Sequence, residues 1–459
     1  MRTTFRSFLA LLACMTSLAS AYADDSKVAA ARAGIDALVN RLAGDGTAPV
    51  RNAIVQVSVP SMQFEHTAVA GIARADSREQ MTAERPFYIA SITKSIVAVR
   101  ILQLVEAGKL SLDTTIAQTG ILPTDALARL QVYEGHSYGG EITVRQLLQH
   151  RTGLRDMLLD DRHHLSDEFE SGTAPGSLGG IWSSQLARYV ECRRQAGTCS
   201  TDETARLYPG HRWVAWNATA WQRDPKNREA GLINFFLSEM DNAGLFPPGQ
   251  AFHYADTNYI LLGMLIEQIT GRNLHAELRD SIFAPLGMQR TYLSYAPDPD
   301  ARPCDLPPAD FWVGDIPAIS SGLDISFDWA GGGVVTTAAD LNRFLRGLQY
   351  GKVFRDNASR DAMLQCVDTP VSHGRHGGYG LGIRCLETDF GPMWGHMGAW
   401  GSAMLLFPQQ DVAITGTVNR LFDNEAMQSL VFGSMTELQA AGLLREPEKR
   451  AEAAGAAGR

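Results

Sequence analysis

The sequence predicts an α+β fold in which an antiparallel sheet is built from both ends of the chain and flanked by helices. Alternating apolar and polar residues at 53–59 and 66–71 are typical of two neighbouring strands near the start of the chain. Two further strand-like runs, 402–408 and 412–418, flank a short polar turn near its end. Helical patterns occupy mainly the middle of the chain, which favours a sheet closed by the two ends with a helical region inserted.

Several segments predict helices. The longest, 91–108, is apolar nearly all round, as expected of a helix buried in the core, and Gly108 ends it. The other segments show an amphipathic face or a suitable N-cap, such as Thr143 or Thr337. They are 26–44, 142–150, 259–271, 341–348 and a last segment that runs through Leu438.

We expect one domain over residues 24–443. Its α/β part comprises about 26–90 and 326–443, and its helical part comprises about 91–325. Within the helical part, residues 155–246 lose clear periodicity, which indicates an enlarged, mainly helical insertion that folds over a neighbouring surface. Residues 444–459 are rich in Ala, Gly, Glu and Arg and are predicted to be a disordered tail.

Residues 1–23 resemble a secretory signal peptide. Arg2 and Arg6 precede an apolar stretch, and two small-x-small cleavage sites follow at 19–21 and 21–23. The apolar stretch is shorter than the roughly 18–20 residues that a membrane span needs. We therefore expect a periplasmic or secreted protein with no integral membrane segment after cleavage, while lipidation at Cys14 stays open.

Charge and cysteine usage narrow the possible partners. The 459 residues carry a net charge of −9, which argues against nucleic-acid binding because that needs basic patches. Five cysteines follow position 14. Export makes disulfides plausible, and their connectivity cannot be deduced from the sequence alone. The nearest pairings are Cys192 with Cys199 and Cys366 with Cys385, which would leave Cys304 over.

Ser91 and Lys94 stand three residues apart at the start of the long apolar helix. Residues at i and i+3 lie on the same helix face, so the lysine amine can reach the serine hydroxyl. A serine hydroxyl is a weak nucleophile until a base takes its proton. Burial disfavours the ammonium form of a lysine, which suits Lys94 to act as that base.

Two later motifs make this signal specific: Tyr254-Ala255-Asp256, and His396-Met397-Gly398-Ala399 before the last strand pair. Ser-x-x-Lys, Tyr-x-Asp and His-x-Gly in this order resemble the serine β-lactamase and penicillin-recognising peptidase superfamily. The similarity is greatest to its class C-like branch of class C β-lactamases, DD-carboxypeptidases, D-aminopeptidases and family VIII esterases. It spans Phe87 to about Gly416, interrupted by the insertion, and segments 87–90, 150–154, 285–288 and 331–340 also match.

The resemblance implies a β-lactamase/transpeptidase-like fold and a serine hydrolase that works through an acyl-enzyme without a cofactor. Ser91 would attack a carbonyl carbon, and Lys94 and Tyr254 would share the base role, with the first proton acceptor left open. A phenol beside an ammonium is drawn toward its phenolate form. The backbone amides of Ser91 and Ala399 would form the oxyanion hole. Gly398 would be small so that substrate can lie against its strand, and the other substrate-binding residues would be Asp256 and His396.

Two positions depart from the pattern of many relatives. His396 stands where lysine is common, and because the charge of a histidine is conditional near neutral pH, recognition of a substrate carboxylate is less secure. Asp256 stands where asparagine is usual, and an ionised carboxylate cannot donate a hydrogen bond. We expect it instead to hold Lys94 by charge. Both changes favour a peptidase or esterase, acting on a small-molecule or peptide-like acyl substrate, over an efficient β-lactamase.

Other readings of the sequence remain. The chain could be a class C-like β-lactamase or DD-peptidase, or a penicillin-binding-like protein that is acylated once without turnover. Ser137 lies in a Gly-x-Ser-x-Gly segment typical of α/β-hydrolases, but no helix follows it directly, so a surface turn is expected. The acidic and histidine residues at 160–164 lack a second set of ligands, which favours a solvated loop and no metal.

Overall fold

The computed structural model describes residues 24–44, 49–160, 232–239, 243–294, 306–321, 328–369 and 377–444. The predicted signal peptide, most of the insertion and nearly all of the predicted tail lie outside the described residues, as do Cys192, Cys199 and Cys304. In the part of the chain that is described, no helix has both the length and the apolar character to cross a bilayer.

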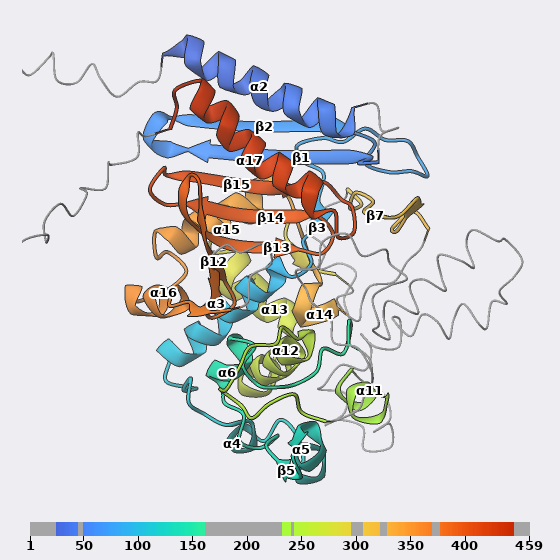
Figure 1. Ribbon diagram of the computed structural model, residues 1–459, viewed down its shortest axis with the longest axis vertical. Coiled ribbons are helices and arrows are strands. Elements are labelled where there is room, and N and C mark those ends of the chain that lie inside the picture. The colour runs from blue at the N-terminus through green and yellow to red at the C-terminus, as the bar shows by residue number, and fades with distance from the viewer. Residues whose placement is uncertain are drawn as a thin grey trace, which may run out of the picture.

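Within the described residues, an antiparallel sheet of eight strands joins the two ends of the chain (Figure 1). Its order is β10-β11-β12-β13-β14-β15-β1-β2, so the last strand of the chain lies beside the first. In the centre, Val57 of β1 pairs with His66 of β2 and with Ile414 of β15. The predicted closure of the sheet by both chain ends is confirmed. The strands are β1 Asn52–Val59, β2 Phe64–Gly71, β10 Val367–Asp368, β11 Gly377–Tyr379, β12 Arg384–Thr388, β13 Gly391–Gly398, β14 Ser402–Phe407 and β15 Val412–Thr417.

Different helices cover the two faces of this sheet. Helices α2 (Asp25–Ala43) and α17 (Asn424–Ala440) pack against each other and against one face, where Figure 1 shows them lying together. On β1, Val55 and Val57 belong to this apolar layer. Ser58 points to the other face, where its hydroxyl oxygen accepts a hydrogen bond at 3.0 Å from Arg346 of α15 (Ala338–Gln349). The two-residue period of the strand therefore separates two packed layers.

Helix α3 (Ile92–Glu106) connects the sheet to the helical part. It packs against β13 and β14 on the sheet side and against α12 (Asp256–Thr270) and α14 (Trp329–Gly332) on the helical side. Most of its side chains are therefore buried, which confirms the prediction for 91–108. The remaining helices are α4 Ile116–Thr119, α5 Thr124–Leu130, α6 Val144–Leu148, α11 Leu232–Glu239, α13 Leu274–Leu278 and α16 Asn357–Met363, with short turns η1 Pro60–Met62 and η3 Arg279–Phe283. The remaining strands are β3 Phe87–Tyr88, β4 Val132–Tyr133, β5 His136–Ser137, β6 Tyr292–Leu293, β7 Trp312–Val313, β8 Ile316–Pro317 and β9 Val334–Thr336.

Local boundaries follow the predicted caps with one informative exception. The side chains of Thr143 and Thr337 accept hydrogen bonds from backbone amides of α6 and α15, as predicted. Helix α12 begins at Asp256, three residues before the predicted start. The sequence pattern does not predict this first turn because its residues are polar and show no apolar period. This early start places Asp256 itself on the helix. A disulfide joins Cys366 to Cys385, which confirms that pairing.

Candidate active site

Ser91 lies at the sharp turn from β3 into α3. The preceding Ala90 has φ 45°, in the left-handed region that residues with side chains rarely adopt and that recurs at functional sites. Ser91 occupies the N-cap position of α3, but its hydroxyl does not cap the helix. Its side chain is only half-buried, so the hydroxyl can meet both a neighbouring side chain and a bound substrate.

Lys94 lies one turn further along α3 and is fully buried. Its Nζ donates hydrogen bonds to the Ser91 hydroxyl at 3.1 Å and to the Gly331 carbonyl oxygen at 2.9 Å. It also forms a hydrogen-bonded ion pair with the carboxylate of Asp256. A Cβ at position 331 would lie 2.4 Å from that carboxylate, so the close approach of α14 to Lys94 requires glycine there.

Other buried carboxyl groups lie behind this ion pair. Asp156 accepts a hydrogen bond from the backbone amide of Asp256 at 3.1 Å, and the carboxyl group of Asp328 lies 3.4 Å from the position that a Cβ on Gly331 would take. Burial and the negative charge of Asp256 raise the pKa of Asp328 to about 7. Burial, together with Asp256 and Asp160, also raises the pKa of Asp156 well above its usual range. The fixed negative charge next to Lys94 is therefore concentrated on Asp256 at mildly acidic pH.

Tyr254 brings the second predicted motif to the same place. Its ring centroid lies 4.9 Å from the Lys94 Nζ, and its side chain is buried. The ring stacks on the imidazole of His150, with centroids 4.0 Å apart and planes 25° apart. The structure therefore places Ser91, Lys94, Tyr254 and Asp256 in one cluster, although Lys94 and Asp256 are 162 positions apart in sequence.

His150 fixes one side of the Tyr254 ring. Its Nδ1 accepts a hydrogen bond from the backbone amide of Ala255 at 3.1 Å, and because an amide can only donate, Nδ1 carries no proton. Burial, then the positive charges of Lys94 and Arg384, hold the pKa of His150 well below its ordinary value. The imidazole stacked on Tyr254 is therefore neutral.

His396, from the third motif, is fully buried on β13. Its Nδ1 donates to the carbonyl oxygen of Met397 at 2.7 Å, which leaves Nε2 to accept from the Tyr379 hydroxyl at 2.9 Å. Burial and the charge of Arg384 lower the pKa of His396 well below its ordinary value. His396 lies 6.3 Å from Tyr254 between ring centroids. It joins the site as a neutral group and supplies no positive charge near neutral pH.

The end of β13 is tied to the segment before Ser91. Ser402, which pairs with Gly398, donates to the Ile89 carbonyl oxygen at 2.8 Å. A Cβ on Gly398 would lie 2.2 Å from that same oxygen, so the glycine is required by the protein backbone in addition to any substrate. The carbonyl oxygens of Ala90 and Gly398 both accept backbone hydrogen bonds, at 2.9 Å each. Because N–H and C=O point in opposite directions across a trans peptide, these bonds fix the directions of the Ser91 and Ala399 amides.

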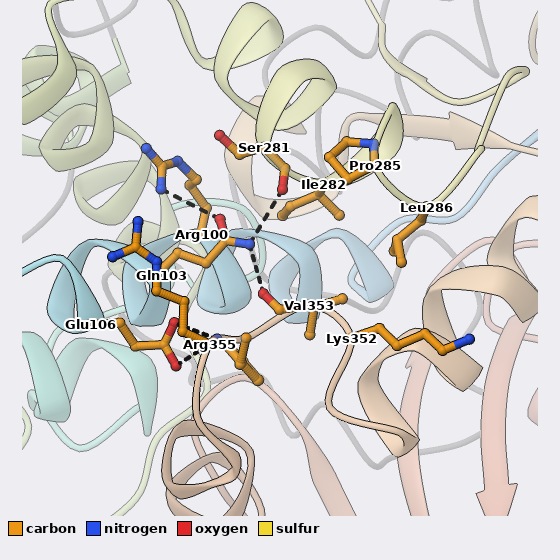
Figure 2. Close-up of a pocket in the computed structure, with 11 residues that line it drawn as sticks. Arg100, Gln103, Glu106, Ser281, Ile282, Pro285, Leu286, Lys352, Val353 and Arg355 are labelled. Carbon is orange, nitrogen blue, oxygen red and sulfur yellow. Dashed lines mark hydrogen bonds between the residues drawn. The ribbon is translucent and has the colours of Figure 1, made fainter.

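Two other candidate features lie away from this cluster. Ser137 is exposed in the short hairpin of β4 and β5, as expected for a surface turn. A cavity of about 300 Å³ lies at the opposite end of α3, where it contacts Gln103 and Glu106 (Figure 2). Gln103 donates to the Val353 carbonyl oxygen and Glu106 accepts from the Arg355 amide, so these polar groups serve to join the surrounding loops.

Sequence reasoning left several members of the cluster without a role. They are His150, Asp156, Asp328, Tyr379 and Arg384. His150 begins one of the matching segments, which was the only signal available for it. The others belong to no motif, and only the folded chain brings them to Lys94 and Tyr254. In the described residues, no group of His, Cys, Asp or Glu side chains has a metal-binding arrangement.

The chain resembles known proteins along most of its length. A family model described as Beta-lactamase matches residues 17–430. Penicillin-binding protein 4 of Amycolatopsis lactamdurans is 24% identical over 358 residues, which are 73% of this chain and 72% of that protein. A D-aminopeptidase of Brucella anthropi is 31% identical over 157 residues, which are 34% of this chain and 28% of that protein. The match therefore spans less than a third of the aminopeptidase.

Among solved structures, the D-amino acid amidase from Ochrobactrum anthropi SV3, complexed with L-phenylalanine amide, superposes with a TM-score of 0.60. The superposition covers 90% of this chain and 99% of the amidase, at 20% sequence identity. The two proteins share a fold, which confirms the predicted architecture of an antiparallel sheet flanked by helices.

Proposed function

The chain belongs to the beta-lactamase family of serine hydrolases, and we propose that it cleaves an amide or ester by forming an acyl-enzyme at Ser91. The observation that carries this proposal is the position of the Lys94 Nζ, 3.1 Å from the Ser91 hydroxyl and paired with Asp256. A serine hydroxyl within hydrogen-bonding reach of a fixed proton-carrying group is the arrangement needed for nucleophilic catalysis. The centre of the Tyr254 ring lies 4.9 Å from the same Nζ, which brings a second side chain that can carry a proton beside Lys94.

The contacts of Lys94 favour Tyr254 as the first base. Among the described residues, its Nζ has three hydrogen-bond acceptors: the Ser91 hydroxyl, the Gly331 carbonyl oxygen and the Asp256 carboxylate. An ammonium group has three N–H donors, so this set satisfies the charged form completely. Lys94 then acts as a fixed cation that orients the Ser91 oxygen, and the phenolate of Tyr254 accepts the proton.

In the acylation step, the Ser91 Oγ forms a bond to the substrate carbonyl carbon and its proton passes to Tyr254. The amides of Ser91 and Ala399 donate to the resulting oxyanion. The carbon–nitrogen or carbon–oxygen bond of the substrate then breaks, and the leaving group takes the proton from Tyr254. In deacylation a water molecule adds to the acyl carbon, passes a proton to Tyr254, and the proton returns to the Ser91 oxygen as the ester bond breaks.

For the substrate, we propose a small amide or a peptide-like acyl compound rather than a β-lactam. One relative is named a D-aminopeptidase, and the protein that superposes is named a D-amino acid amidase. The neutral state of His396 supports this choice, because a neutral imidazole does not anchor a substrate carboxylate as a cation does. D-Amino acid amides are therefore the first compounds to test.

For location, we propose export to the periplasm or the medium. The signal-like segment 1–23 is one reason, and the Cys366–Cys385 disulfide is the other, since disulfides persist mainly in oxidising compartments. Immunoblotting of fractions for the full-length chain, beside a variant lacking residues 1–23, tests this proposal. Equal retention of both forms in the cytosol would contradict it.

The central experiment is covalent labelling of the folded protein with a fluorophosphonate, followed by peptide mass spectrometry. The label is expected on the peptide that contains Ser91, to be absent from Ser91→Ala, and to be unaffected by Ser137→Ala. A label on Ser137, or none on folded wild-type protein, would refute the proposal.

Substrate class is tested in parallel with D- and L-amino acid amides, short-chain p-nitrophenyl esters and a chromogenic cephalosporin. Turnover of amides or esters above the cephalosporin is expected. A stoichiometric burst with no subsequent turnover would instead indicate a penicillin-binding-like protein that is acylated once. This second outcome is tested because one relative is named penicillin-binding protein 4.

A further inference from the structure

Arg384 brings a second cation to Tyr254. Its guanidinium carbon lies 5.3 Å from the centroid of the Tyr254 ring and 5.4 Å from that of Tyr379. The Lys94 Nζ lies 4.9 Å from the same Tyr254 centroid. Two positive groups therefore lie next to one phenol, and one of them belongs to no sequence motif of the site.

The position of Arg384 is fixed by the sheet. It is the first residue of β12 and pairs with Tyr379 on β11 and with Gly395 on β13, next to His396. The residue is only 8% exposed. A guanidinium stays protonated at every pH at which a protein is folded, so this charge is permanent. Water screens it weakly because the site is buried.

The other described groups around Tyr254 are mostly neutral or paired with one another. His150 and His396 are neutral, and the carboxylate of Asp256 is bound directly to Lys94. Asp156 and Asp328 lie behind Asp256 and favour their protonated forms at mildly acidic pH. Among the described residues, the other titratable neighbours are Tyr259, whose pKa is raised well above its ordinary value by burial, and Tyr379, whose hydroxyl donates to His396.

We propose that Arg384 is a positioning residue that keeps Tyr254 in the phenolate form in which it accepts the Ser91 proton. This proposal rests on the acyl-enzyme function proposed above. The Tyr254 proton is released to solvent when the free enzyme ionises, and the phenolate oxygen then takes one proton from Ser91 in each acylation. Arg384 exchanges no proton itself. It acts by making the negative charge on the phenolate oxygen more favourable.

The 5.3 Å separation is measured to the centre of the Tyr254 ring, so it sets the scale of the effect on the phenolate oxygen. Two unit charges about 5 Å apart at an effective dielectric constant near 20 interact strongly enough to move an ionisation midpoint by about two pH units. Side-chain flexibility and partial screening reduce this value. We expect removal of the Arg384 charge to raise the acidic midpoint of the kcat/KM profile by about one to two pH units.

The test compares Arg384→Gln and Arg384→Lys with wild type, using whichever amide or ester the enzyme turns over. Arg145→Gln is the matched control, because it removes one positive charge from a partly exposed side chain on α6, where Arg145 pairs with Asp113. For Arg384→Gln, kcat/KM near pH 7 should fall about tenfold or more and recover at higher pH. Arg384→Lys should stay closer to wild type because it keeps the charge. Thermal unfolding of each variant shows whether it is folded.

An independent measurement needs no change at Arg384. The ultraviolet absorbance of tyrosinate is titrated in wild type and in Tyr254→Phe, and the difference gives the ionisation of Tyr254 alone. It should appear well below the ordinary tyrosine value of about 10. A difference that appears only near or above that value would overturn the proposal, even if Arg384→Gln failed to fold.

The results separate this inference from the proposed function. If the fluorophosphonate fails to label Ser91 in wild type, the proposed function is wrong and this inference with it. If Ser91 is labelled but folded Arg384→Gln keeps the wild-type profile, only the role of Arg384 is wrong. If KM for anionic substrates rises in Arg384→Gln while the pH profile of kcat/KM stays unchanged, the proposed role of Arg384 is also wrong. Arg384 would then bind the substrate instead of acting on Tyr254.

Discussion

Replacing Asp328 with asparagine should raise the free energy of unfolding above that of wild type at mildly alkaline pH. At acidic pH the gain over wild type should be much smaller. Asp328 is buried beside Gly331, with only 7% of its surface exposed. Burial, followed by the negative charge of Asp256, raises its pKa to about 7. An asparagine of the same shape resembles the protonated carboxyl group and does not titrate.

The sign and magnitude follow from proton linkage. An unfolded aspartic acid ionises near pH 3.9, so between about pH 4 and 7 the folded protein holds a proton on Asp328 that the unfolded chain has lost. The free energy of unfolding therefore falls as pH rises through this window, by up to 1.36 kcal/mol per unit. Over about three units the loss is about 4 kcal/mol, and the Asp328→Asn variant avoids it.

Urea unfolding of both proteins at about pH 5 and about pH 8 measures this effect. The variant should gain about 3 kcal/mol relative to wild type between the two conditions, because about two units of the window are crossed. His150 and His396, held neutral by burial, lower the stability of both proteins alike at acidic pH, so they cancel in the comparison. Asp125→Asn, an exposed position on α5, is the control and should show no such gain. An equal difference between Asp328→Asn and wild type at both pH values would refute the reasoning.

Three further predictions concern the site and its support. Lys94→Met should lower kcat/KM at least about a thousandfold, because the group that orients the Ser91 oxygen is lost. It should also lower the free energy of unfolding by about 3 kcal/mol, because Asp256 is left buried without its cation. A stability equal to wild type would contradict the ion pair. Tyr254→Phe should lower kcat by a factor of about 10² to 10⁴, because the proton acceptor is lost. Thermal stability should stay close to wild type, since the ring still stacks on His150. Steady-state kinetics measures the loss of kcat, and calorimetry on the same preparation measures the stability. The double variant Cys366→Ser/Cys385→Ser should lose about 3 kcal/mol of stability, as expected for a bridge across 19 positions, and a reductant should destabilise wild type but leave the variant unchanged.

The predicted strands and helices were largely recovered because their signals are local. The alternation along 53–59 reflects a strand with a packed layer on each side, and the caps at Thr143 and Thr337 act within one helical turn. The start of α12 was placed three residues late because Asp256, Thr257 and Asn258 are polar yet buried. Their burial is compensated by hydrogen bonds to distant residues, such as that between Asn258 and Thr152, which no local pattern reveals.

The candidate site divides in the same way. The spacing of Ser91 and Lys94 on one helix predicted their contact, and the order of the three motifs predicted that Tyr254 and His396 would join them. Arg384 could not be predicted as a member of this cluster. Its place beside Tyr254 follows from the pairing of β12 with β11 and β13 at one edge of the sheet.

The sequence by itself determined the order of elements, the closure of the sheet by both chain ends and which residues are proposed to carry the proton, because periodicity, capping and motifs can be read directly from the order of residues. Only the tertiary structure decided the charges at the site. Whether Asp328 holds its proton, and whether His396 is neutral, depends on burial and on Asp256 and Arg384, which reach the site from distant parts of the chain.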